Sequence, residues 1–208
     1  MSVREDTNTF SVEVYATDNV KLSQLLEAAV NSHSQPRFPG VGESNMECVS
    51  SFCKKRCMDL SAKPNATYIL DNTRPESNLP EGFKRGSLSI SDVATVNKHW
   101  PYTIYVGEDY MRQRIENQPT ASIVKEDTGE MIAWGILYDY NSVGALHVRA
   151  GYRRLGLGSA LVCNLAQKSW SVWHHPFAYI EFGNSASQRM FTKLGWRRVS
   201  DAYFFFRL

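Results

Sequence analysis

The chain has 208 residues, a formal net charge of +2 at pH 7 and 43% hydrophobic residues. This length suffices for a buried core in one domain or in two small ones. The nearly balanced charge excludes a nucleic-acid binder that relies on bulk positive charge. No apolar run approaches the length of a membrane span, so we expect no membrane association.

The cysteines Cys48, Cys53, Cys57 and Cys163 show neither paired C-x-x-C spacing nor the framework of a small disulfide-bonded domain. We therefore expect reduced thiols and no metal site. The opening residues, MSVREDTNTF, contain neither a hydrophobic signal segment nor an arginine-rich presequence. These features predict a cytoplasmic protein.

The first part of the chain reads as a small α/β portion. Its predicted elements are a strand at 10–15, a helix capped by Asp18, a loop at 33–44, a helix at 46–60 and a strand at 67–70. The first helix is expected to turn Leu22, Leu25, Leu26 and Ala29 inward. The polar stretch DNTRPESNLPEGFKRG follows. We place the domain boundary there, between residues 1–82 and residues 83–208.

The second part alternates helices and strands. We expect first a helix capped by Ser91, a helix at 109–117, and a hairpin of 121–125 and 131–138 with Gly129 at positive φ. The next expected elements are a strand at 143–148, a helix at 157–170 and a strand at 177–182. The last are a helix at 185–194 and strands at 196–199 and 203–206. Asn184 and Gly195 are expected to begin and end the last helix. The order strand, helix, strand predicts two parallel neighbours that diverge toward their C-terminal ends.

The organising stretch is VGALHVRAGYRRLGLG, in which an apolar strand runs into a turn rich in arginine and glycine. The helix that follows offers unpaired N–H groups and the positive end of its dipole, which favours an anion. Gly156 and Gly158 remove the Cβ atoms that would hold a ligand away, while Arg153 and Arg154 add attraction. The turn therefore predicts a cradle for a polyphosphate.

Spacing separates the possible ligands of this cradle. A dinucleotide fingerprint requires glycine where the chain has Leu161, and a nucleotide-triphosphate loop requires a lysine after Gly158. The pattern R-x-x-G-x-G, read from Arg153, instead resembles the CoA pyrophosphate motif of the GNAT superfamily of acyl-CoA-dependent N-acyltransferases. A second stretch, NSASQRMFTKLGW at residues 184–196, resembles the second signature of that superfamily.

The segments VNKHWPY, NQPTASIV and AWGILYD resemble the C-terminal half of the glycine N-acyltransferase family. The resemblance implies an α/β (α+β) GNAT fold, with a mixed central sheet and splayed parallel strands flanked by helices. It implies an enzyme that moves an acyl group from acetyl-CoA or another acyl-CoA to the amine of glycine or another small amino acid or amine, by direct attack in a ternary complex. A mitochondrial location is also compatible with this family, although no presequence is visible.

The expected partners are the acyl-CoA and a small amine, without nucleic acid, membrane or metal, in a monomer or a homodimer. The pantetheine arm is expected to lie between the two parallel strands and to pair with strand backbone. The residues that the resemblance assigns to the cofactor are Leu146, His147, Val148, Arg153, Arg154, Leu155, Gly156, Leu157, Gly158, Ser159, Asn184, Ser187 and Phe191.

The sequence departs from the family at both positions for proton transfer. Ser142 stands where the resemblance places a glutamate general base, and Phe191 stands where it places a tyrosine that protonates the thiolate. The nearest alternatives for the base are Asp139, Tyr140 and His147. A path made only of water also stays open.

His147 has a suitable unperturbed pKa for a base. By strand alternation its side chain points away from the cradle helix, toward the segment at 102–117 where we expect the acceptor to enter. Its alternative role is that of a half-buried strand histidine without catalytic function. For the whole chain, the alternative to an enzyme is a catalytically weak or inactive acyl-CoA-binding protein that acts as a sensor or interaction module.

Overall fold

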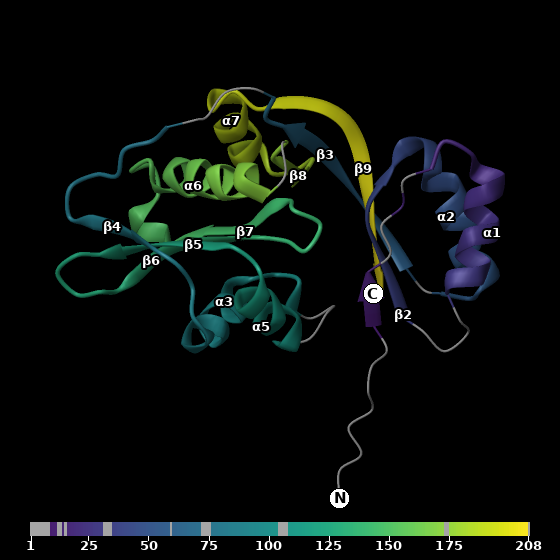
Figure 1. The fold of residues 1–208 in the computed structure, drawn as a ribbon, viewed down its shortest axis with the longest axis horizontal. Coiled ribbons are helices and arrows are strands. Elements are labelled where there is room, and N and C mark those ends of the chain that lie inside the picture. The colour runs from purple at the N-terminus through teal and green to yellow at the C-terminus, as the bar shows by residue number, and fades with distance from the viewer. Residues whose placement is uncertain are drawn as a thin grey trace, which may run out of the picture. The chain divides into compact units, whose positions relative to one another are not determined.

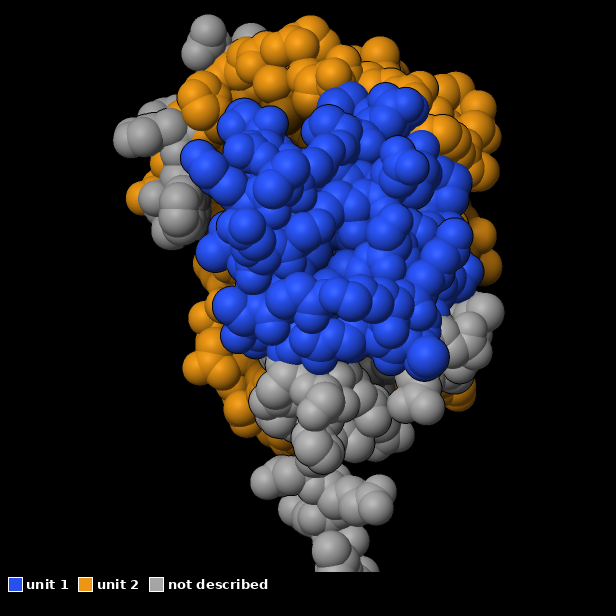
Figure 2. All heavy atoms as spheres, turned by 90° about the vertical axis from the view of Figure 1, so that its right-hand side faces the viewer, with its two compact units in different colours: residues 1–66, 200–208 blue, residues 67–199 orange. Residues whose placement is uncertain are grey.

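The computed structural model describes residues 9–11, 14, 16–30, 35–58, 60–71, 76–103, 108–172 and 175–207. The chain divides into two compact units, unit 1 with residues 1–66 and 200–208 and unit 2 with residues 67–199 (Figure 2). It passes from one unit to the other within β3 (Leu60–Ile69) and β9 (Arg197–Arg207). The domain boundary predicted after residue 82 stays a prediction, because compactness does not show that a segment folds by itself.

Unit 1 contains β1 (Thr9–Ser11), α1 (Asn19–Ala29), β2 (Gln35–Gly42) and α2 (Glu43–Lys55). Strand β1 pairs in parallel with β2, and β2 pairs antiparallel with β9. The full strand order of this sheet is β1-β2-β9-β3-β8. Helix α2 packs on β2 and on α1 (Figure 1). None of the helices in the described part of the chain combines the length and apolarity needed to cross a membrane.

Strand β2 replaces the loop that the sequence predicted at 33–44, so that prediction is wrong. Phe38 and Val41 of this strand are completely buried. The Phe38 ring makes edge-to-face contacts with Phe52, at 6.3 Å between centroids, and with Phe205, at 6.4 Å. Burial of these side chains and pairing with β9 outweigh the glycine and proline content that suggested a loop.

Helix α1 begins as predicted but buries a narrower stripe. The Asp18 carboxylate accepts hydrogen bonds from two N–H groups of the first turn, at 2.9 and 3.2 Å. Leu22 and Leu26 are buried, whereas Leu25 is 64% exposed and Ala29 is exposed. Two residues four positions apart define the buried line, and Leu25 lies about 100° around the helix from Leu26.

Unit 2 is built on a second sheet, in the order β4 (Phe83–Gly86), β5 (Thr120–Lys125), β6 (Met131–Leu137) and β7 (Val143–Val148), with every pair antiparallel. Helix α6 (Leu157–Val172) covers one face, and α3 (Val93–His99) and α5 (Glu108–Asn117) cover the other (Figure 1). The hairpin of β5 and β6 confirms its prediction, with Gly129 at φ +69°.

The helix ends in unit 2 show one error of the sequence analysis. Ser91 does not cap α3, whose N-cap residue is Asp92. Ser89 and Asp92 instead form a capping box around the 3-10 turn Ile90–Asp92 that precedes the helix. Helix α7 (Ser185–Lys193) follows the prediction more closely: the Asn184 side chain caps its first turn, and Gly195 follows its end at φ +84°.

Strands β7 and β8 (Phe177–Glu181) run parallel and meet at a bridge between Ser142 and Phe177. Beyond that bridge they belong to different sheets. The parallel orientation is confirmed at this bridge, and pairing ends beyond it, as expected for strands that diverge. The expectation that the two strands are neighbours in one sheet is wrong, because β8 pairs with β3 in the other sheet. The strands predicted at 196–199 and 203–206 are one continuous strand, β9, which lies inside its sheet between β2 and β3.

Candidate functional site

A β-bulge in β7 marks the point where this strand departs from regular pairing. The register of β6 and β7 shifts between Trp134 and Ile136, so that Gly135 lies opposite both Ala145 and Leu146. Ala145 has φ +48°, which a residue with a Cβ atom adopts rarely. A bulge bends a strand and increases its local twist. It therefore accounts for the divergence of β7 from β8.

The second half of β7 offers a backbone edge to a ligand. The Arg149 N–H donates to the Ile132 carbonyl oxygen at 3.0 Å, which fixes the alternation of the β6–β7 ladder. By that alternation the N–H groups of Leu146 and Val148 point away from β6. They point toward the side on which β8 diverges. An extended ligand with its own amides can pair with this edge as an added strand would.

The turn from β7 into α6 has the backbone conformation of an anion cradle. Arg154, at φ +71°, and Gly156, at φ +81°, are both in the left-handed region. The first hydrogen bond of α6 runs from the Ala160 N–H to the Gly156 carbonyl oxygen at 3.0 Å. The N–H groups of residues 157–159 precede that bond and have no acceptor within the helix. They are the donors that an anion would satisfy.

The side chains around this turn add positive charge. Arg153 is exposed, and its Nε donates to the Val148 carbonyl oxygen at 3.1 Å, at the end of β7. Arg154 is exposed, and Leu155 is 47% exposed. Arg149 pairs with Glu130. Two exposed guanidinium groups therefore flank the start of α6.

The two glycines of the turn have different structural roles. No atom lies within 4 Å of a Cβ built at Gly156, so the requirement there is its positive φ. A Cβ at Gly158 would lie 3.1 Å from Met190 Sδ and 3.7 Å from Val148 Cγ2. Gly158 therefore allows α6 to approach α7 closely. Contact of either glycine with a cofactor stays a prediction.

The second motif supplies mainly local structure. Asn184 Oδ1 accepts a hydrogen bond from the Ser187 N–H at 3.1 Å, which begins α7. Phe191 is 1% exposed, and its ring meets Trp196 edge to face at 4.9 Å. These observations explain why the motif has these residues as fold elements. Their predicted contact with a cofactor stays a prediction.

His147 lies on the opposite face of the sheet from α6, as strand alternation predicts. Its ring stacks on Trp134 at 4.4 Å between centroids and lies 4.7 Å from the ring of His99 on α3. Burial lowers the pKa of His147 from 6.5 to about 4, with smaller contributions from His99, Arg153 and Arg149. The imidazole is therefore neutral at pH 7 and able to accept a proton.

His99 lies beside the candidate residue His147, and the sequence analysis did not identify it. It is exposed, and its Nδ1 lies 2.9 Å from the Thr95 carbonyl oxygen. In the neutral ring that nitrogen donates to the carbonyl, which leaves Nε2 as an acceptor. The only signal in the sequence was helical spacing, since position 99 follows the buried Val96 by three residues. No spacing links residue 99 to residue 147.

The other candidates for the base are less suited to proton transfer. Asp139 forms an ion pair with Arg114, whose side chain is 9% exposed, at 2.8 Å. Burial raises the pKa of Tyr140, which stacks on Tyr138 at 5.3 Å, so its hydroxyl stays protonated. Ser142 is 2% exposed. The geometry thus favours His147 among the predicted candidates.

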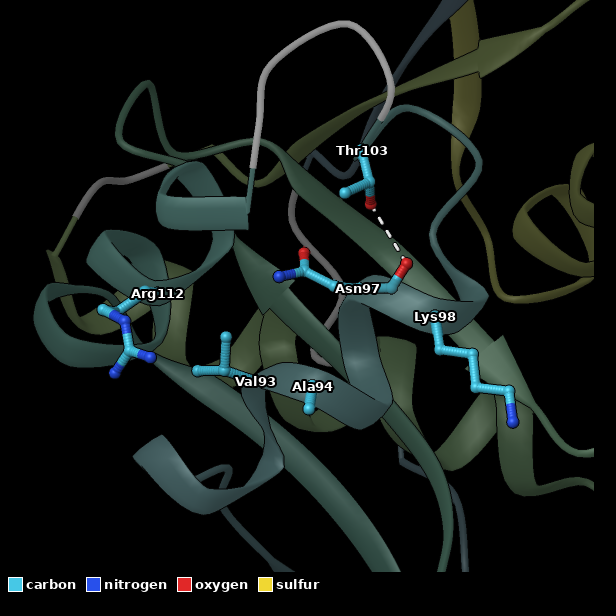
Figure 3. Close-up of a pocket in the computed structure, with 6 residues that line it drawn as sticks. All are labelled: Val93, Ala94, Asn97, Lys98, Thr103 and Arg112. Atoms are coloured by element: carbon cyan, nitrogen blue, oxygen red, sulfur yellow. Dashed lines mark hydrogen bonds between the residues drawn. The ribbon is translucent and has the colours of Figure 1, made fainter. Parts of the chain in front are cut away.

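A cavity of about 260 Å³ is lined by residues of α3 and α5, the helices that cover the face of the sheet carrying His147, and by Thr103 (Figure 3). Its lining residues are Val93, Ala94, Asn97, Lys98, Thr103 and Arg112. The Thr103 hydroxyl donates to the Asn97 carbonyl oxygen at 3.0 Å and closes one end of α3. Lys98 is exposed, and Arg112 reaches Asp109 only at 3.9 Å. The cavity therefore combines two accessible cations, one of them in the segment where the acceptor is expected.

The cysteines of the chain are free thiols. Burial raises the pKa of Cys53 to about 11 and also raises that of Cys163. Both are therefore poor nucleophiles at neutral pH. Across the described residues, no group of three or more His, Cys, Asp or Glu side chains is arranged to hold a metal ion.

Comparisons with solved structures bear on the fold of the chain. A Drosophila protein of known X-ray structure is 19% identical, with a TM-score of 0.83 over 97% of this chain and 71% of that one. A GCN5-related N-acetyltransferase from Kribbella flavida is 14% identical, with a TM-score of 0.59 over 94% and 77%. The chain has the GNAT fold. The predicted α/β (α+β) GNAT fold is thereby confirmed.

Two further comparisons bear on the GNAT fold of this chain. A tandem GNAT protein from the clavulanic acid biosynthesis pathway, solved without acetyl-CoA, is 12% identical, with a TM-score of 0.57 over 90% of this chain and 68% of that one. The family model described as FR47-like protein matches residues 121–205, which include β7, the cradle and α7. None of the curated proteins matches the sequence.

Proposed function

We propose that this chain is an N-acyltransferase that moves an acyl group from acetyl-CoA or another acyl-CoA to the amine of glycine or another small amino acid or amine. The observation that carries the proposal is the divergence of β7 and β8 beyond the Ser142–Phe177 bridge, with the start of α6 at the far end of β7. The GNAT fold and the FR47-like match support acyl transfer. The acceptor is inferred from the cavity residues and the sequence resemblance.

The acyl-CoA would bind along β7. Its pyrophosphate fits the unpaired N–H groups of residues 157–159, with Arg153 and Arg154 as counter-charges. The pantetheine amides would pair with the backbone edge of β7 that faces away from β6. This placement directs the thioester toward the bulge and toward the face that carries His147.

The reaction would be a direct transfer. The amine nitrogen attacks the thioester carbonyl carbon, a C–N bond forms, and the C–S bond breaks. An N–H of the β7 edge, from Leu146 or Val148, would stabilise the oxyanion by roughly 3 kcal/mol. His147 would take a proton from the nitrogen after the C–N bond has formed, when that nitrogen is most acidic. Phe191 has no hydroxyl, so the leaving thiolate would take its proton from water.

A base with a pKa of about 4 is a weak proton acceptor. We therefore expect His147 to contribute at the lower end of general-base effects, on the order of 10²-fold. Holding the thioester and the amine in attack geometry contributes more, roughly 7–11 kcal/mol. The proposed rate enhancement thus depends mainly on binding both substrates.

The cavity favours an acceptor that carries a carboxylate. Lys98 and Arg112 line it, and Lys98 directly precedes His99, which lies against His147. The two side chains lie at opposite ends of the lining (Figure 3), so a glycine carboxylate would pair with one of them and present its amine on the side of the sheet that α3 and α5 cover. A charged hydrogen bond of this kind contributes about 1.5–3 kcal/mol.

The test measures turnover of acetyl-CoA, a medium-chain acyl-CoA and benzoyl-CoA with glycine, alanine and ethylamine. The N-acyl product is detected by mass spectrometry, because the exposed Cys57 would react with thiol reagents. Whichever of Lys98→Gln and Arg112→Gln removes the partner of the carboxylate should raise KM for glycine about 10-fold, without changing KM for ethylamine. Equal effects on both amines would contradict carboxylate recognition, and the absence of product from every pair would contradict the enzyme.

A second candidate function is acyl-CoA binding without efficient turnover. One observation favours it: the position expected for a glutamate base holds Ser142, which is 2% exposed, and the alternative base has a low pKa. Such a protein would act as a sensor or an interaction module. Calorimetric binding of CoA together with absent product formation would support this candidate over the enzyme.

A further inference from the structure

The acyl-transfer proposal uses His147 but gives no role to His99, whose ring lies beside it. Their centroids lie 4.7 Å apart, and both rings contact Trp134, at 5.5 Å for His99 and 4.4 Å for His147. Trp134 is 1% exposed and gives both histidines a fixed apolar support. The three side chains come from α3, β6 and β7, so the tertiary fold alone brings them together.

The two rings differ in their access to water. His147 is half-buried, whereas His99 is exposed. The charged groups that face His147 are His99 from α3 and Arg149 and Arg153 from the chain after β7. All are cationic or can become so, and together with burial they oppose a charge on His147. A proton taken up by His147 therefore has to leave quickly for the next turnover.

The orientation of His99 suits it to receive that proton. Its Nδ1–H is held by the Thr95 carbonyl oxygen at 2.9 Å, which leaves Nε2 as the acceptor of the neutral ring. An imidazolium at this exposed position is hydrated and needs no buried counter-charge. The half-buried His147 ring is less accessible to water.

We infer that His99 is a positioning residue for proton exit: acting through His147, it receives the proton of the acceptor amine and passes it to water. This inference rests on the proposed acyl transfer. The amine nitrogen loses one proton to His147, the proton moves to His99 and then to solvent, and the thiolate takes one proton from water. Both imidazoles return to their neutral form, so the overall reaction is acyl-CoA plus amine giving amide plus CoA thiol.

The experiment compares the full chain with His99→Gln and His147→Gln. As a matched control we use His175→Gln, because His175 is exposed in the loop before β8. We expect His99→Gln to lower kcat about 10-fold while KM for acyl-CoA and amine stays within about 2-fold. Added imidazole should restore part of the lost rate, because a small base can replace an exposed ring. His175→Gln should match the parent.

An independent readout does not require substrate. NMR titration of the His147 ring should show a higher pKa in His99→Gln than in the parent, because the neighbouring charge has been removed. The acidic limb of the pH–rate profile should move to higher pH by the same amount. A residue with only a structural role would change the melting temperature without moving either titration.

The outcomes separate this inference from the function on which it rests. If the parent turns over and His99→Gln has the parent's kcat, the inference is wrong and the acyltransferase stands. If kcat falls but the His147 titration is unchanged and imidazole gives no recovery, His99 is structural and the inference is also wrong. If no acyl-CoA and amine react with the parent, the proposed function fails and the inference fails with it.

Discussion

The two faces of β7 obtain their functional groups in different ways. On the α6 side, the cradle is made by consecutive residues, and its donors are backbone N–H groups whose positions follow from φ values and a helix start. On the other side, His147 acquires its surroundings from Trp134 and His99, which lie on separate elements. A site of the first kind depends on local backbone geometry. A site of the second kind depends on packing of the whole unit.

The largest effects on stability should come from truncating a large buried side chain on either side of the sheet that contains β7. Trp134→Ala should lower the free energy of unfolding by about 3–5 kcal/mol, and Leu165→Ala, on the buried side of α6, by about 2–5 kcal/mol. Denaturant unfolding measures both values. Only Trp134→Ala should also raise the pKa of His147, because water then reaches its ring. An unchanged His147 titration in Trp134→Ala would contradict the dependence of this face on packing.

A smaller effect should appear when the cradle is filled. CoA at about 100 times its dissociation constant should stabilise the protein by about 2.7 kcal/mol, seen as a rise in melting temperature. Replacing Gly156 or Gly158 by valine should reduce this gain, since one position needs a positive φ and the other has Met190 at 3.1 Å from its Cβ position. Gly42→Ala serves as the control, because Gly42 lies in unit 1 and no atom lies within 4 Å of a Cβ built there. If CoA leaves the melting temperature of the parent protein unchanged, the prediction of a cradle is wrong.

The smallest expected effect is the pH dependence of stability that His147 causes. The ring binds a proton more weakly in the folded chain, where its pKa is about 4, than in the unfolded chain, at 6.5. Its contribution is therefore fully present above pH 6.5, decreases as the pH falls toward 4, and is constant below that. Allowing for the partial exposure of the ring, the loss is on the order of 1 kcal/mol. Denaturant titrations of the parent and His147→Gln between pH 4 and 7 should differ by this slope, and parallel curves would contradict it.

Local signals predicted the elements whose cause is local. The Asp18 and Asn184 caps, the positive φ of Gly129 and the left-handed Gly195 each follow from a residue type at a helix end or a tight turn. Strand β2 was missed because its reason to be a strand is pairing with β9, which lies far along the chain. A polar turn composition carries no information about such a partner.

The same distinction applies within the candidate site. The cradle was predicted from consecutive residues, whereas the packing of Gly158 against Met190 is shown by no local pattern. The direction of His147 followed from alternation on one strand, whereas its proximity to His99 required the position of α3 over the sheet. The low pKa of His147 could not be predicted, because it arises chiefly from burial created by the tertiary structure.

Unit 1 is made of two segments that are far apart in the sequence, and this affects how the chain folds during synthesis. Unit 1 includes residues 1–66 and residues 200–208, whereas unit 2 is the continuous segment 67–199. On a ribosome, the segment of unit 2 emerges completely before the last part of β9 does. Nascent chains usually complete their N-terminal unit first. Here β2 cannot pair with β9 until residues such as Phe205 have emerged. Unit 1, whose first residues are synthesised first, therefore completes its sheet last.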